Sequence, residues 1–112
     1  MATLYPETEA AFQEKVMSLA TLYGWDVAHF TAAMMPNGRW FTPIKGRRGF
    51  PDLVLVHETR GTLFVELKAA KGRLSPDQIE WLRKLNNAGN EVYVWRPDDM
   101  PFITKRLAGA HE

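Results

Sequence analysis

Two carboxylates and a lysine stand where neighbouring β-strands would bring them together. Asp52 begins an apolar segment, and 14 residues later a second apolar segment ends in Glu66, Leu67 and Lys68. A turn between the two segments would place both acids at the same end of a β-hairpin. Acidic oxygens beside a lysine indicate a divalent metal site of the kind that hydrolyses phosphodiester bonds.

The strand register decides whether the two acids meet, because side chains alternate between the faces of a strand. Glu66 and Lys68 share a face of their strand, as Asp52 and Val56 do of theirs. If Val56 pairs with Thr62, Asp52 lies opposite Glu66, with Cβ atoms about 4.5–5.5 Å apart. Two carboxylates so close repel each other unless a proton or a cation lies between them. We therefore expect Mg²⁺ or Mn²⁺ there.

A helix predicted over residues 7–23 carries another acid toward the same region. Glu9 falls in the middle of its apolar stripe, which consists of Phe12, Val16, Leu19, Ala20 and Tyr23. A carboxylate that points at the core is costly unless it is paired or ligated, so Glu9 is a candidate catalytic residue and metal ligand. The alternative is that Glu9 stabilises the helix N-terminus and reaches solvent.

Gln78 has two interpretations that the sequence leaves open. Ser75, Pro76, Asp77 and Gln78 form a strong helix start, in which Gln78 would close a capping box with Ser75. Gln78 also lies on the apolar stripe of that helix, so it could support the metal-binding carboxylates.

Periodicity and turn residues predict a small α/β protein. The expected elements are helices over 7–23 and 75–88, strands over 25–30, 53–56, 62–68 and 91–95, and a last helix over 98–107. Residues 31–50 read as a long loop. The order αβββαβ predicts a small mixed β-sheet flanked by helices, with the last strand returning beside the third. We expect a single domain over 1–112, with its core over 7–97 and a C-terminal helix and tail over 98–112.

Composition sets the broad class of the protein. The chain has 112 residues, of which 46% are hydrophobic and 24% charged, and it has no cysteine. This composition is typical of an ordinary globular domain and excludes disulfides and thiolate metal sites. No apolar run approaches the roughly 20 residues that span a bilayer, and no signal-peptide pattern precedes the first helix. We expect no membrane association and a cytoplasmic location.

Basic residues are concentrated in two segments although the net charge is only +1. These candidate nucleic-acid-binding residues are Arg39, Lys45, Arg47 and Arg48 in the long loop, and Lys71 and Arg73 after the second hairpin strand. Contacts with DNA phosphates would make binding depend steeply on salt. The alternative is that both segments are ordinary solvated loops.

Several aromatic and histidine residues allow more than one role. Trp40 and Phe41 could stack on an unpaired base or anchor their own loop. His29 could assist proton transfer or contact phosphate, although a lone histidine is more often structural. The other tryptophans, Trp25, Trp81 and Trp95, are expected to pack in the core or at its edge.

The ordered set of motifs resembles the stand-alone phage and bacterial members of the VRR-NUC (virus-type replication-repair nuclease) family, within the PD-(D/E)XK nuclease superfamily. The resemblance covers about residues 7–97. Its motifs are Glu9-Ala10-Ala11-Phe12-Gln13, Gly24-Trp25, Gly49-Phe50-Pro51-Asp52-Leu53, Glu66-Leu67-Lys68, Gly72-Arg73-Leu74-Ser75-Pro76-Asp77-Gln78, and Gly89-Asn90-Glu91-Val92-Tyr93-Val94-Trp95-Arg96-Pro97.

The resemblance implies a restriction-endonuclease-like core and a set of residue roles. Asp52 and Glu66, with the Leu67 backbone carbonyl, would bind Mg²⁺ or Mn²⁺, and Lys68 would act on the attacking water or the phosphate. Glu9 and Gln78 would match the family's helical acid and glutamine. The implied activity is that of a metal-dependent DNA endonuclease selective for branched or Holliday-junction DNA in replication, repair or recombination. It would work as a homodimer in a bacterial cell or phage-infected host.

Two other functions remain possible. A DNA-binding module that does not cut could keep the fold and the basic loops, although it would have little reason to retain all of Asp52, Glu66 and Lys68. A structural or interaction protein could use the same acids in ordinary salt bridges. Binding of a divalent metal would separate this last function from both nucleic-acid functions.

Overall fold

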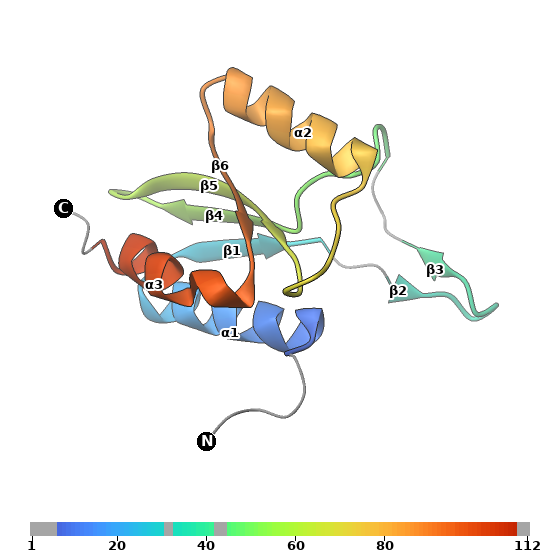
Figure 1. The fold of residues 1–112 in the computed structure, drawn as a ribbon, viewed down its shortest axis with the longest axis horizontal. Helices are drawn as coiled ribbons and strands as arrows, with labels where there is room; N and C mark the ends of the chain where they lie inside the picture. The colour runs from blue at the N-terminus through green and yellow to red at the C-terminus, as the bar shows by residue number, and fades with distance from the viewer. Residues whose placement is uncertain (1–6, 31–32, 42–44, 110–112) are drawn as a thin grey trace.

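The structure is a computed structural model that describes residues 7–30, 33–41 and 45–109. Within these ranges, three α-helices and a central β-sheet make up the body, and a short hairpin projects from it (Figure 1). The body consists of α1 (Glu9–Leu22), β1 (Asp26–His29), β4 (Leu53–His57), β5 (Gly61–Leu67), α2 (Pro76–Asn87), β6 (Glu91–Trp95), a 3₁₀ turn (Pro97–Asp99) and α3 (Met100–Ala108). The hairpin consists of β2 (Ala33–Met34) and β3 (Trp40–Phe41).

The central sheet is mixed, and its strand order is β1-β4-β5-β6. β1, β4 and β5 pair antiparallel, whereas β6 returns after α2 to pair parallel with β5. This arrangement confirms the predicted α/β architecture. The hairpin register is also as predicted, since Val56 pairs with Thr62 and Leu53 pairs with Val65.

The two faces of the sheet are covered by different helices (Figure 1). One face is fully buried under α1 and α3 (Figure 1) and consists of Leu53, Leu55, Leu63, Val65 and Leu67. Phe12 and Val16 of α1 and Ile103 and Leu107 of α3 complete this core. Each such side chain contributes about 1.5–3 kcal/mol when it is fully buried, so this face fixes the strand register. The opposite face lies toward α2 (Figure 1).

The interpretation of residues 31–50 as a loop was incomplete. Within it, β2 and β3 pair antiparallel, with Ala33 opposite Phe41 and Met34 opposite Trp40. The turn is closed by Asn37, whose Oδ1 accepts from the Arg39 N–H at 3.0 Å. Strands of two residues are too short to show a periodicity of two, so this hairpin gave no strand signal. Residues 31–32 and 42–44 of the expected loop lie outside the described residues.

Gly49 brings the segment before Asp52 directly against the start of α2. Its φ of +94° is left-handed, and a Cβ built on it would lie 2.6 Å from the Asp77 carbonyl carbon and 2.7 Å from the Gln78 nitrogen. The basic loop can therefore approach α2 this closely only because residue 49 lacks a side chain.

We expect Gly49→Ala to lower the free energy of unfolding by about 2–5 kcal/mol, since it adds a backbone clash to an unfavourable φ. Gly46→Ala is the matched control, because Gly46 also has a positive φ, +100°, but its Cβ would meet no described atom within 4 Å. That variant should lose only about 1–2 kcal/mol. Urea unfolding of both variants measures the difference, and equal losses would contradict the close approach.

Candidate active site

Asp52 and Glu66 lie opposite each other at the open end of the β4–β5 hairpin. Leu53 pairs with Val65, so the next step outward along the register places Asp52 beside Glu66. Asp52 is half-buried just before β4, and its Oδ2 accepts from the Leu67 N–H at 2.9 Å. This bond fixes the Asp52 carboxylate against the strand that carries Glu66.

Glu66 is a buried carboxylate with only part of its hydrogen-bonding capacity used. Its side chain is 1% exposed, and Oε2 accepts from Gln78 Nε2 at 3.0 Å and lies 3.8 Å from Lys68 Nζ. Its other oxygen, Oε1, is buried and has no hydrogen-bond partner within the described part of the chain. An unsatisfied buried acceptor costs about 1–3 kcal/mol. The arrangement is therefore incomplete unless a proton or a cation is bound.

The electrostatic surroundings of Glu66 disfavour its charged form. Burial, followed by the proximity of Asp52, raises the pKa of Glu66 from its usual 4.5 to about 8. Lys68 acts in the opposite direction, and Glu9 adds a smaller repulsion. A carboxyl with such a pKa holds a proton at neutral pH. A divalent cation between Glu66 and Asp52 would take the place of that proton.

Gln78 joins the start of α2 to the site. Its Oε1 accepts from the Ser75 N–H at 2.8 Å and its backbone N–H donates to Ser75 Oγ at 3.2 Å, which completes the capping box. Its Nε2 simultaneously donates to Glu66. The predicted cap is therefore present, and the other end of the same amide contacts Glu66. Its support of a metal site stays a prediction.

Lys68 leaves β5 toward the same carboxylate. Its side chain is 12% exposed, and its backbone N–H donates to the Trp95 carbonyl at 3.0 Å. This bond continues the parallel pairing of β5 with β6 and fixes the direction in which the lysine leaves the sheet. Leu67 is buried between Glu66 and Lys68. The metal-binding role of its carbonyl stays a prediction.

Glu9 is near enough to Glu66 to add to the rise in its pKa, and its catalytic and metal-binding roles stay predictions. It is the first residue of α1, capped by Thr8, and its side chain is exposed. Among the described residues, no three His, Cys, Asp or Glu side chains form a group that could hold a metal ion. The expectation of a core-facing Glu9 was wrong because periodicity gives the direction of a side chain but not its depth. On this stripe burial begins only at Phe12.

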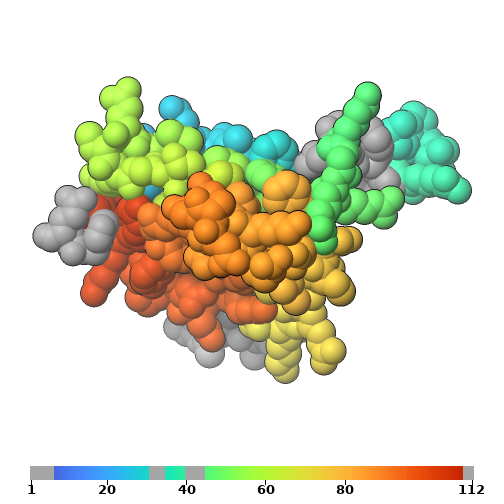
Figure 2. Space-filling model, turned by 90° about the horizontal axis from the view of Figure 1, so that it is seen from above, coloured from blue at the N-terminus to red at the C-terminus, as the bar shows by residue number. Residues whose placement is uncertain are grey.

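The predicted phosphate-binding residues are all exposed: Arg39, Lys45, Arg47, Arg48, Lys71 and Arg73. In Figure 2 the segments 45–50 (green) and 69–74 (yellow) lie on either side of the N-terminal end of α2. Arg47 is anchored there, since its carbonyl accepts from Trp81 Nε1 at 3.2 Å and its Nη2 lies 3.7 Å from Asp77 Oδ1. Arg39 instead lies on the projecting β2–β3 hairpin.

Arg96 was not identified from the sequence, yet it shapes the segment that follows Lys68. Its Nη1 donates to the carbonyls of Gly72 at 2.7 Å, Ala69 at 2.8 Å and Ala70 at 3.4 Å. These bonds hold the loop that carries the second basic segment. Sequence patterns cannot reveal them, because the partners are backbone carbonyls that every residue possesses.

The remaining sequence candidates are His29 and the aromatic residues. His29 pairs with Leu53, so its side chain lies on the opposite face of the sheet from Asp52 and Glu66. Trp25 and Trp95 are buried in the core and Trp81 is half-buried, which confirms their packing role. The side chains of Trp40 and Phe41 lie outside the described part of the structure, so their stacking role stays a prediction.

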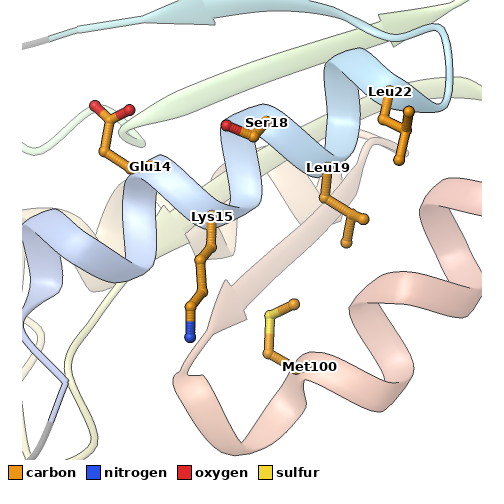
Figure 3. A pocket seen from close by; sticks show the side chains of 6 residues that line it. All are labelled: Glu14, Lys15, Ser18, Leu19, Leu22 and Met100. Atoms are coloured by element: carbon orange, nitrogen blue, oxygen red, sulfur yellow. The ribbon is translucent and has the colours of Figure 1, made fainter.

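A hollow of about 490 Å³ lies between α1 and α3, the helices on the other face of the sheet (Figure 3). Its lining is mostly apolar and consists of Glu14, Lys15, Ser18, Leu19, Leu22 and Met100. It contains no pair of acids and is not part of the site. None of the helices in the described ranges is long and apolar enough to cross a membrane.

We expect the stability of the metal-free protein to fall as pH rises from about 4.5 to 8. The folded state raises the pKa of Glu66, so it binds the proton more tightly than the unfolded state. The resulting stabilisation is fully present below the unfolded pKa and is lost as pH rises through the folded pKa. At about 1.4 kcal/mol per pKa unit, the loss is on the order of a few kcal/mol.

Urea unfolding in EDTA at several pH values measures this loss, and Glu66→Gln should flatten it. Glu58→Gln, which removes an exposed carboxylate from the turn of the same hairpin, should leave the pH dependence intact. A wild-type protein as stable at pH 8 as at pH 5 would contradict the assignment of this proton to Glu66.

Comparison with known proteins agrees with this geometry. A family model for the VRR-NUC domain matches residues 39–99, a stretch that includes Asp52, Glu66, Lys68 and Gln78. A solved structure described as a "VRR_NUC domain protein" superposes with a TM-score of 0.59 at 18% identity, over 96% of this chain and 87% of that chain. At that identity the likeness shows the fold alone. No curated protein gives a significant match. Because the family model spans more than half of the chain, the chain belongs to the VRR-NUC family of nuclease-type domains in DNA processing.

Proposed function

We propose that this protein is a metal-dependent DNA endonuclease that cuts branched DNA. The observation that carries the proposal is the buried Glu66, which lies opposite Asp52 and keeps one carboxylate oxygen without a partner among the described residues. Membership of a nuclease family supports the assignment of this pair to phosphodiester hydrolysis rather than to a structural ion pair.

Asp52 and Glu66 would hold the metal ion, with the Leu67 carbonyl as a further candidate. The donor set consists of hard oxygens, which suit Mg²⁺ or Mn²⁺. The unsatisfied Oε1 of Glu66 and the raised pKa of this residue fit a site that gains from a bound cation. When bound, the ion would supply Lewis-acid activation of water and of the scissile phosphate.

Lys68 and Gln78 act on this pair from two sides. Lys68 places a nearly buried ammonium beside Glu66, where it stabilises negative charge that develops on the phosphate or positions the attacking water. Gln78 donates to the Glu66 oxygen that faces Lys68 and so fixes the carboxylate orientation. Groups that orient a metal ligand in this way typically change activity by about 10–100-fold.

The DNA backbone would lie over the N-terminal end of α2, between the two basic segments (Figure 2). Exposed lysine and arginine side chains at both sides offer phosphate contacts, and the positive end of the α2 dipole adds to them. The projecting β2–β3 hairpin extends this surface through Arg39.

The resemblance to junction-cutting nucleases adds two elements to the proposal. One is preference for branched DNA, including Holliday junctions. The other is a homodimer, since a second copy would provide a second site for the second strand of a junction. We also propose that residues 1–112 act as one nuclease domain, because α3 supplies Ile103 and Leu107 to the common core.

Cleavage of labelled four-way junction, flap, duplex and single-stranded DNA tests the proposal. We expect cutting with Mg²⁺ or Mn²⁺ and none with EDTA, strongest on a branched substrate. Asp52→Asn and Glu66→Gln should each lower the rate by at least about 10²-fold, whereas Glu58→Gln at the other end of the hairpin should not. Binding without cutting would favour the DNA-binding module, and neither binding nor cutting would favour a structural role.

The dual role of Gln78 leads to a separate expectation. Gln78→Ala should lower the cleavage rate by about 10–100-fold because Glu66 loses its orienting donor. Ser75→Ala removes the capping hydroxyl, costs about 1 kcal/mol of stability, and leaves the Gln78–Glu66 bond in place. Its cleavage rate, measured well below the melting temperature, should stay near wild type. Equal losses in the two variants would mean that Gln78 serves only as a cap.

A further inference from the structure

Phe30 lies directly beside the acid pair. It follows β1, and its backbone N–H donates to the Asp52 carbonyl at 3.0 Å. The register of β1 with β4 ends at His29 opposite Leu53, so Phe30 occupies the next position, next to Asp52. Side-chain alternation then places Phe30 on the face that carries Asp52 and Glu66.

The ring contacts of Phe30 confirm that face. Its ring meets Phe50 edge to face, with centroids 5.3 Å apart and planes at 89°. Phe50 in turn packs against Trp81 of α2 at 5.0 Å and against Phe64 of β5 at 6.2 Å. Phe30 is thus the outermost member of an aromatic row that α2 and the sheet hold in place.

Phe30 differs from the rest of the row in its exposure. Phe50, Phe64 and Trp81 are half-buried, whereas Phe30 leaves 38% of its surface open to solvent. The Phe30 ring, which packs against Phe50, thus offers a flat apolar surface next to Asp52, one of the two proposed catalytic acids. The segments that flank Phe30 in the chain add no further carboxylate to this acid pair, since no acidic residue occurs from Val27 to Pro51.

We infer that Phe30 stacks on an unpaired nucleobase next to the phosphodiester that is cut. The inference rests on the proposed function and adds a specificity-determining residue to it. Nucleobases are the flat groups that accompany phosphates, and aromatic side chains bind them through their faces. A base inside a duplex already has a neighbour on each face, so only an unstacked base can bind Phe30. The substrate class is therefore DNA with an unstacked nucleotide at the cleavage position, as at a flap or at the branch point of a junction.

Binding experiments in EDTA test this contact without requiring cleavage. The probe is a flap DNA that carries 2-aminopurine in the first unpaired nucleotide, and the reference is a fully paired duplex of the same sequence. Wild-type protein should quench the flap probe by stacking. Phe30→Leu should lose the quenching and weaken flap binding by roughly 5–150-fold, with duplex binding unchanged. Phe30→Tyr keeps an aromatic face and should retain both.

Phe102→Leu is the matched control. Phe102 is also an exposed phenylalanine, at 49%, but it lies on α3, which covers the opposite face of the sheet (Figure 1). Its replacement should change neither quenching nor affinity. A Phe30→Leu variant that binds and quenches like wild type would overturn the inference, and so would equal losses in the leucine and tyrosine variants.

A measurement on the wild-type protein tests the same contact without any substitution, so its result does not depend on whether a variant folds. Flap DNA with 5-iodouracil at the same unpaired position should photo-crosslink to Phe30, as mapped by mass spectrometry of the peptides. A crosslink confined to other residues would overturn the stacking contact. If wild type crosslinks through Phe30 but cuts no DNA with either metal, the nuclease proposal fails while the stacking contact stands.

Discussion

The burial of Glu66 is the constraint on which the rest of the site depends. The residue belongs to a strand whose other face is leucine and valine in the core, so hydrophobic packing on that face leaves the carboxylate no freedom to move outward. Its desolvation is offset in part by the Gln78 amide and the Lys68 ammonium. One carboxylate oxygen of Glu66 is left without a partner among the described residues, and the repulsion from Asp52 is not offset. The proposed cation would relieve both.

The same constraint explains the position of α2. The helix covers the face of the sheet that carries Glu66, although none of its own side chains is fully buried. The contacts that anchor it lie in its first two turns. There the Gln78 amide reaches Glu66, Trp81 Nε1 binds the Arg47 carbonyl, and Gly49 contacts the first turn. One helix end thus positions a ligand of the proposed metal, a basic loop and an aromatic row together.

The sequence predicted the parts of the site that follow from strand and cap geometry. The predicted pairing of Val56 with Thr62 is present, and this register brings Asp52 to Glu66. The Ser75–Gln78 cap could also be predicted, because a capping box is defined by residue types at a short, local spacing. The prediction that Glu9 faces the core was wrong, because the burial of a side chain at a helix end depends on which elements surround that end. Arg96 and Phe30 were missed because their contacts with backbone carbonyls and with a distant ring leave no pattern in the chain.

The parallel pairing of β6 has a consequence for the order in which the protein becomes active. The Lys68 N–H finds its partner in Trp95, 27 residues further along the chain, and the loop after Lys68 is held by Arg96. The acids, by contrast, belong to a local hairpin, and contacts across short loops form faster than contacts between distant segments. In the order of synthesis, both acids therefore precede the strand that fixes the direction of the lysine. The proposed catalytic group is complete only when the last strand has been synthesised and docked.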